Sequence, residues 1–362
     1  MLEIDPELWP LRFDFLSSRN VILSLFIVLF PVLYILSFGL KVVCNIYIKI
    51  FFFYIFFISI SVFWSDSVED TLLAIIGIWS GFIVSIYIGR NYSLTSIVYS
   101  MVYSMLLVCF LSSILFLLNS DIALNDELFF RFKGIINHSQ RFALQLAFVS
   151  IISFIYFWNS GNKFFLYSSI IFSFFIILTF TRAWTTFYVL TIILYIFNSI
   201  NYRRKFYLVV LSLAFLPFVL NYSILDLYQR SDSDITELSG RSQLWNILYS
   251  DISDSPMLGH GFGSFREGVF QVNSWLPAHA HNMWLHLMYE TGIFGTIILN
   301  VFIFISFFWR SRISDAVLKD IIKYLTFFIL LSSLTGVILG RLIGPVYILY
   351  LSILFNISSN KN

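Results

Sequence analysis

Residues 283–305, MWLHLMYETGIFGTIILNVFIFI, form an apolar run long enough to cross a membrane. About 20 such residues span the hydrocarbon core of a bilayer as a helix. The run follows WLPAHAHN at 275–282, so that three of the five histidines, His279, His281 and His286, fall within eight residues. A polar stretch rich in histidine therefore leads directly into a predicted membrane span.

The composition extends this prediction to the whole chain. Of the 362 residues, 59% are hydrophobic and 12% are charged, and the mean hydropathy is +0.86. This leaves too little polar surface to cover a water-soluble globule of this length. The net charge of +2 gives no sign of nucleic-acid binding. Cys44 and Cys109 both lie in apolar runs, where we expect small buried side chains and not a disulfide.

Apolar runs recur along the chain and predict an all-α, polytopic membrane helix bundle of about 11–12 transmembrane helices with one large periplasmic loop. This divides the chain into N-terminal transmembrane helices (1–221), a periplasmic loop carrying active-site residues (222–282) and C-terminal transmembrane helices (283–362). An even number of spans is the alternative to eleven. The eleven predicted spans are 21–40, 48–64, 71–89, 93–118, 142–158, 163–181, 183–200, 205–221, 283–308, 320–339 and 341–356.

The basic residues predict which loops face the cytoplasm. Lys and Arg flanking short loops favour the cytoplasmic side, and five groups of them fall on alternate sides of consecutive spans. This orientation places WSDSVED (64–70) and the loop 222–281 together on the opposite side, which is periplasmic or extracellular. The five groups are Lys41/Lys49, Arg90, Lys163, Arg203–Arg204–Lys205 and Arg310–Arg312–Lys319–Lys323.

The remaining basic side chains gather on the predicted outer side, against the usual preference of Lys and Arg for the cytoplasm. We infer that they bind an anion at the membrane surface, such as the diphosphate of a lipid carrier. The residues of this outer group are Arg131, Lys133, His138, Arg141, Arg182, Arg230, Arg241, His260, Arg266, His279, His281, His286 and Arg341.

Arg182 and Arg241 are the arginines with the most specific surroundings. Arg182 stands between two long apolar runs, where a guanidinium needs an anion; the alternative is a short turn from which it reaches the lipid headgroups. Arg241 follows a Ser-Gly pair that favours a helix start, so that its fork and backbone N–H groups can bind phosphate oxygens. A salt bridge within the loop is the alternative for Arg241.

The histidines at the loop end suggest acid–base chemistry. Asn282 is a predicted N-cap, which places His281 at the positive end of the helix, where a neutral imidazole is favoured. A neutral histidine is a competent general base. His279 is the second candidate for this role, whereas His286, inside the helix, is predicted to be a packed core residue. A metal site is the rival interpretation, but His-x-His supplies only two ligands and no carboxylate stands at a metal spacing.

Several segments, taken in order, resemble the bacterial O-antigen ligase and polysaccharide polymerase superfamily of integral membrane glycosyltransferases. The segments that carry the resemblance are SVFWSDSVEDTL (61–72), FKGIINHSQRFALQLAF (132–148), Thr-Arg at 181–182, GRSQLW (240–245), PMLGHGFGSF (256–265) and AHAHNMWLHLMYETGIFG (278–295). The glycines of GHGFG also permit close backbone approach to a phosphate or sugar, although an ordinary turn is the simpler interpretation.

The resemblance implies en bloc transfer of a glycan from undecaprenyl diphosphate to a hydroxyl of an acceptor glycolipid, without a nucleotide sugar. It makes His281 the base and Arg182 and Arg241 the diphosphate-binding residues. From the outer basic group, we predict Arg131, Arg141, His138 and Arg266 as further substrate contacts, and we expect no cofactor or metal. The NHSQR segment (137–141) departs from the family pattern. A repeat-unit polymerase, with a chain-length regulator as an additional partner, is favoured over a ligase. A polysaccharide transporter and a non-catalytic receptor are the alternatives from other classes.

Overall fold

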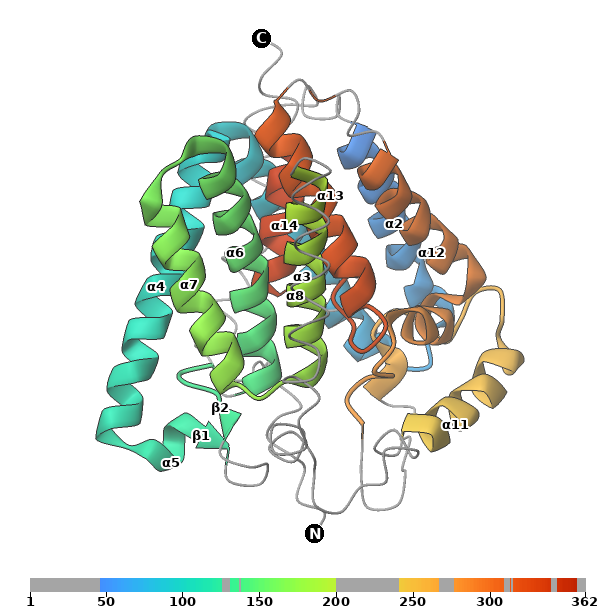
Figure 1. Cartoon of the computed structure of the whole chain (residues 1–362). Helices are drawn as coiled ribbons and strands as arrows, with labels where there is room; N and C mark the ends of the chain where they lie inside the picture. The colour runs from blue at the N-terminus through green and yellow to red at the C-terminus, as the bar shows by residue number, and fades with distance from the viewer. Residues whose placement is uncertain are drawn as a thin grey trace, which may run out of the picture. The chain divides into compact units, whose positions relative to one another are not determined.

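The computed structural model describes residues 46–125, 131–136, 138–199, 241–266, 277–308, 313, 315–339 and 344–356. Figure 1 shows their helices and strands. The chain divides into two compact units. One unit combines residues before 102 with residues after 242, and the other comprises residues 102–242. The predicted spans 21–40 and 205–221, Cys44, Arg230 and Arg341 lie outside the described residues.

The first unit contains helices from both halves of the sequence. Early in the chain come α2 (Ile46–Ile60), η3 (Ser61–Trp64), α3 (Val68–Asn91) and the start of α4 (Leu94–Leu118). Later in the chain come α11 (Arg241–Asp254), η5 (Ser264–Arg266), α12 (Met283–Phe308), α13 (Ala316–Ser332) and α14 (Pro345–Asn356). Arg241 and Ser242, the first two residues of α11, belong to the second unit, and the rest of α11 belongs to the first.

Close helix contacts hold the first unit together. In Figure 1, α2 and α12 run side by side. Between them, the centroids of the Phe51 and Phe302 rings lie 4.8 Å apart. The helices α3 and α14 approach more closely, since a Cβ at Gly89 would lie 2.7 Å from the carbonyl oxygen of Ser352. Asn356 Nδ2 donates to the Gly89 carbonyl at 2.9 Å. The absence of a side chain at Gly89 therefore permits this contact.

The second unit contains the rest of α4, α5 (Ser120–Ala123), α6 (Ser139–Ser160), α7 (Lys163–Leu178) and α8 (Arg182–Ser199). Hydroxyl groups join α6, α7 and α8: Tyr188 lies 2.9 Å from Ser150 Oγ and 2.7 Å from Ser173 Oγ. Such interhelical hydrogen bonds are typical of helices that pack within a membrane. Cys109, in α4, is buried, as predicted.

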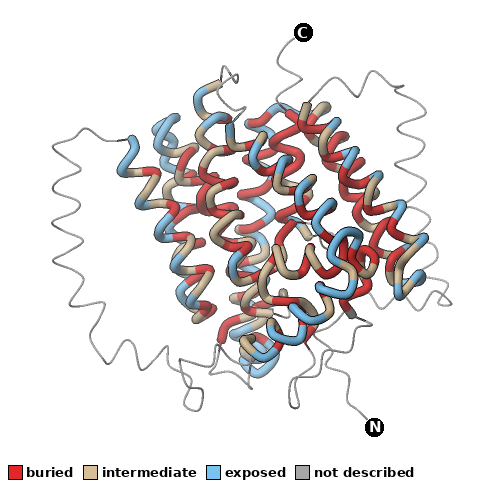
Figure 2. Tube along the Cα trace, turned by 90° about the vertical axis from the view of Figure 1, so that its right-hand side faces the viewer, coloured by how far each residue is buried: buried red, intermediate tan, exposed pale blue. Residues whose placement is uncertain are grey.

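The all-α prediction is confirmed. Among the described residues, the only strands are β1 (Leu124–Asn125) and β2 (Arg131–Phe132), which pair antiparallel. Five described helices are long and apolar enough to cross a membrane, and α7 and α14 are shorter apolar helices. Figure 2 shows buried positions alternating with exposed ones along the helices. The five long segments are Ile46–Trp64, Val68–Asn91, Leu94–Leu118, Ser139–Ser160 and Met283–Phe308.

One helix ends earlier than the predicted span 320–339. The helix α13 ends at Ser332, and turns follow, with Gly336 N–H donating to the Ser332 carbonyl at 3.1 Å. The carbonyl of Ser333 accepts a hydrogen bond from the Met283 N–H at 2.9 Å. At the end of α13, the Ser333 carbonyl thus bonds to the N–H of Met283, the first residue of α12; neither group has a partner within its own helix.

Candidate functional site

The helix α12 is broken at Gly292, whose φ of 61° and ψ of −166° are not helical. In a continuous helix, residues 289 and 290 would accept hydrogen bonds from residues 293 and 294. The segment 256–261 binds all four of these backbone groups instead, which satisfies the hydrogen bonding that the break releases. The four bonds are His260 N to Tyr289 O and Gly261 N to Glu290 O, both 2.9 Å, Ile293 N to Pro256 O, 2.9 Å, and Phe294 N to Met257 O, 3.4 Å.

The glycines of GHGFG allow this segment to approach other backbone closely. Gly259 has a φ of 69°, and a Cβ there would lie 2.6 Å from the backbone of Glu290 and Gly292. A Cβ at Gly261, φ 101°, would overlap Ser65 in the turn before α3. The expected close approach is therefore present, but the partners are α12 and this turn.

Residues 258–262 join η3 and the WSDSVED turn through three further contacts. Asp66 N–H donates to the His260 carbonyl at 3.0 Å, Phe262 N–H to Ser61 Oγ at 3.0 Å, and the Trp64 indole to the Leu258 carbonyl at 3.1 Å. The two segments, which we predicted to share the periplasmic side, thus lie next to each other in the first unit.

The helix α11 packs on the turn that carries the histidines. Its apolar side contributes Leu244, Leu248 and Ile252 to a buried cluster with Phe265, Ala280 and Tyr289. The Trp245 indole N–H donates to the Ala280 carbonyl at 2.8 Å. Because Ala280 stands between His279 and His281, α11 fixes the backbone between these two side chains.

His279 and His281 form a tight turn. The His281 N–H donates to His279 Nδ1 at 3.0 Å, and the two ring centroids are 4.1 Å apart. His281 has a φ of 52°, which is unusual for a residue other than glycine. Residues held in such a conformation concentrate at functional sites.

Asn282 is the N-cap of α12, as predicted. Its Oδ1 accepts hydrogen bonds from Trp284 N–H at 2.9 Å and Leu285 N–H at 3.2 Å. His281 therefore directly precedes the cap, at the positive end of the helix.

His286 is buried, as expected for a core residue, and its partner is Glu290. Their side chains have 0% and 2% of their surface exposed, and His286 Nε2 lies 3.4 Å from Glu290 Oε1. Phe265 N–H also donates to this oxygen at 3.4 Å. A buried carboxylate inside a membrane span is by itself a candidate functional residue. The sequence analysis did not select Glu290, although its position in an apolar run was a sufficient signal.

The two predicted diphosphate-binding arginines lie at the start of α8 and of the described part of α11. Arg182 is the first residue of α8, is exposed, and belongs to the second unit. Arg241 is the first described residue of α11, one turn before Trp245. The predicted helix start at the Ser-Gly pair, residues 239–240, lies outside the described residues. Arg182 stands where backbone N–H groups are not used within the helix.

The other predicted substrate contacts have varied surroundings. In the second unit, Arg131 is largely buried in β2, Arg141 is exposed in the first turn of α6, and His138 caps that helix by accepting from Gln140 N–H at 3.2 Å. The side chain of Arg266 lies outside the described residues. Across the described ranges, no group of three or more His, Cys, Asp or Glu residues is arranged to hold a metal ion.

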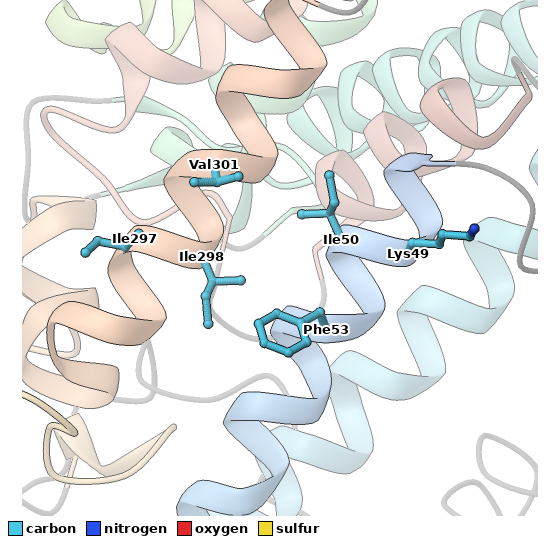
Figure 3. A pocket seen from close by; sticks show the side chains of 6 residues that line it. All are labelled: Lys49, Ile50, Phe53, Ile297, Ile298 and Val301. Carbon is cyan, nitrogen blue, oxygen red and sulfur yellow. The ribbon is translucent and has the colours of Figure 1, made fainter.

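An apolar groove of about 300 Å³ lies between α2 and the part of α12 that follows Gly292 (Figure 3). None of the predicted site residues lines it. The lining side chains are those of Lys49, Ile50, Phe53, Ile297, Ile298 and Val301.

Residues 167–300 match the family model described as O-antigen ligase. The match confirms the resemblance to the O-antigen ligase and polymerase superfamily over a part of the chain that contains Arg182, Arg241, His279 and His281. It supports a function of the ligase or polymerase type in general, and a multi-pass membrane protein. A comparison with curated proteins finds no match.

Proposed function

We propose that the chain is a membrane glycosyltransferase of the bacterial inner membrane that transfers a glycan en bloc from undecaprenyl diphosphate to an acceptor hydroxyl on the periplasmic side. The observation that carries this proposal is the family match over residues 167–300, which includes both candidate arginines and both candidate histidines. The acceptor is a second lipid-linked glycan, which makes the enzyme a repeat-unit polymerase.

The hydrogen bond between the histidines favours His281 as the general base. His279 Nδ1 accepts the His281 backbone N–H, so the hydrogen of a neutral His279 ring is on Nε2. The lone pair of Nδ1 is then used by the His281 N–H, and Nε2 already carries a hydrogen, so neither nitrogen of His279 is available to receive a proton. Nδ1 of His281 is buried, and we therefore assign proton transfer to its Nε2.

In the proposed step, His281 Nε2 removes the proton of the acceptor hydroxyl while the hydroxyl oxygen attacks the anomeric carbon. The bond from that carbon to the phosphate oxygen breaks, and undecaprenyl diphosphate leaves with the bonding electrons. A single displacement inverts the anomeric centre and needs no nucleophile from the enzyme.

Arg182 and Arg241 stabilise the charge that develops on the departing diphosphate. Arg182 begins α8, and helix N-termini favour anions. A guanidinium presents two parallel donors to phosphate oxygens, whereas an ammonium is a point charge. Lysine at either position is therefore expected to restore only part of the donor binding.

Glycan transfer by the purified chain in lipid vesicles tests the assignment of the base. His281→Ala is expected to reduce the rate by about 100- to 10,000-fold, the usual contribution of general base catalysis. His279→Asn is the matched control, because an amide oxygen can still accept the His281 N–H. Wild-type turnover by His281→Ala at equal folded amounts would refute the mechanism, and loss of wild-type activity on adding a chelator would indicate a metal site instead.

Ligation of a finished polymer to lipid A-core is the second candidate, favoured by the description of the matching family model. The glycans of a deletion strain distinguish the two activities. Single repeat units on lipid A-core indicate a lost polymerase, whereas polymer that remains on the carrier lipid indicates a lost ligase.

A further inference from the structure

The ring of His260 contacts three segments of the first unit. Its Nδ1 lies 2.8 Å from Asp66 Oδ2, in the turn before α3. Its Nε2 lies 3.0 Å from the backbone carbonyl oxygen of Asp251, in α11. The ring stacks on Tyr289 of α12, with centroids 4.6 Å apart and planes inclined by 21°. One side chain therefore links the turn, α11 and α12.

Both ring nitrogens face atoms that only accept hydrogen bonds. A carboxylate and a backbone carbonyl have no hydrogen to donate, and a neutral imidazole has only one. The two hydrogen bonds therefore form together only when the ring carries hydrogen on both nitrogens and is positively charged. A charged ring is also attracted to the face of Tyr289.

The charged surroundings favour this cation. Asp66, Glu69 and Asp70 lie at or near the start of α3, and Asp251 and Asp254 lie in the last turn of α11. Glu290 and His286 lie in α12 beside Tyr289. Arg241 begins α11 ten residues before Asp251, which is about 15 Å along the helix axis. The groups nearest to the ring are therefore mainly acidic.

The backbone contacts of this segment do not depend on the charge of the ring. The His260 N–H and carbonyl are bound to Tyr289 and Asp66, respectively, in any protonation state. Protonation therefore changes only the side-chain link to Asp66 and to α11. That helix in turn holds the carbonyl of Ala280, between His279 and His281, through Trp245.

We propose that His260 is a positioning residue, whose doubly protonated ring fixes α11 and the turn before α3 to α12 and so holds the His279–His281 turn in place. A ring that carries hydrogen on only one nitrogen keeps only one of the two side-chain hydrogen bonds, and this hold weakens. The link between the three segments stands on the geometry alone, while its consequence for catalysis rests on the proposed function.

Thermal unfolding of the full chain in detergent tests the link without any glycan transfer. Between about pH 5.5 and 8.5, the wild-type Tm is expected to fall by about 2 °C from this contribution. His260→Gln is expected to lose that part of the pH dependence, because a side-chain amide does not gain or lose a proton in this range. An unchanged pH slope in His260→Gln would overturn the proposal.

Asp66→Ala gives a second test should His260→Gln fail to fold. This change removes the carboxylate bonded to Nδ1, and the pH slope of the Tm is expected to shrink as it does in His260→Gln. Glu69→Ala is the matched control, since it removes a nearby carboxylate of α3 and is expected to keep the wild-type slope. Equal slopes in Asp66→Ala and Glu69→Ala would contradict the link.

The transfer assay tests the catalytic consequence. The ratio of wild-type to His260→Gln activity is expected to be larger at pH 6 than at pH 8.5, because only the wild type has the second hydrogen bond at low pH. Titration of His281 affects both proteins and cancels in this ratio. A ratio independent of pH would refute the positioning role. If the wild-type chain transfers no glycan, the proposed function fails, while the unfolding experiment still decides on the link.

Discussion

Gly292→Ala is expected to destabilise the first unit strongly. The φ of 61° and ψ of −166° at this position belong to a region that only glycine adopts readily. An added Cβ would overlap the carbonyl of Met257 and lie 2.6 Å from Leu258 N. These are backbone atoms, so that the whole segment 256–261 must move before the new side chain fits.

The cost follows from two contributions. A residue other than glycine in such a conformation costs about 1–3 kcal/mol. Moving the segment breaks the hydrogen bonds from Ile293 N–H to Pro256 and from Phe294 N–H to Met257, each contributing about 1 kcal/mol. The total is about 3–5 kcal/mol. Gly161→Ala is the matched control, because Gly161 also has a positive φ, of 71°, but no heavy atom would lie within 4 Å of its Cβ, which leaves a cost of about 1–2 kcal/mol.

Thermal unfolding in detergent provides the measurement, with Gly259→Ala as a further variant. Its Cβ would lie 2.6 Å from Gly292 N, on the other side of the same contact. Each of these two variants is expected to lower the Tm at least about twice as much as Gly161→Ala. The double variant is expected to lower the Tm by less than the sum, because both changes break one contact. Equal losses in Gly292→Ala and Gly161→Ala, or strict additivity of the pair, would show that the segment does not hold the helix break.

Two more predictions concern this part of the molecule. Asn282→Ala removes the cap of α12 and is expected to lower stability by about 1 kcal/mol, whereas Asn282→Asp retains the accepting oxygen and most of the stability; unfolding in denaturant compares them. Partial burial raises the pKa of Asp251 above its ordinary value of 3.8, the charge of His260 lowers it, and Asp254 raises it. Because the folded-state pKa is raised, deprotonation favours the unfolded chain, and the stability present at low pH is lost as the pH rises through the folded-state value. Asp251→Asn keeps the backbone carbonyl and is therefore expected to raise the Tm at pH 7, by an amount that shrinks toward pH 3.8; a gain that does not depend on pH would contradict this.

The cap at Asn282 was predictable because its cause is local. An asparagine just before an apolar run favours a helix start through its own side chain, which binds N–H groups two and three residues later. The helix start at Arg182 follows from a similarly short segment. The apolar runs predicted the five long described helices for the same reason, since hydropathy depends on neighbouring residues.

The break at Gly292 was not predictable in this way. The letters TGIFGTIIL continue the apolar run, and a glycine inside a predicted span is common. The partners that make the break stable lie at 256–261, and neither segment has a local signal for the other. The contact between His260 and Asp66 joins residues 194 positions apart. The sequence analysis assigned His260 to a group of residues that bind the anion of a ligand. In the structure, its ring contacts the carboxylate of Asp66 in the protein itself.

The contact between α3 and α14 affects the order in which the chain can fold during synthesis. Gly89 and Asn356, which bind each other, are 267 residues apart. At about 5–20 residues per second, the ribosome needs roughly 10–50 s to reach the second residue after the first. During this interval α14 has not yet been made and cannot cover that side of α3.

The second unit has no such delay, because residues 102–242 are continuous in the sequence. Its helices α6, α7 and α8 are complete before α11 has been made. We therefore expect the second unit to be able to fold first, and the unit that carries the histidines to be completed by one of the last helices to be synthesised.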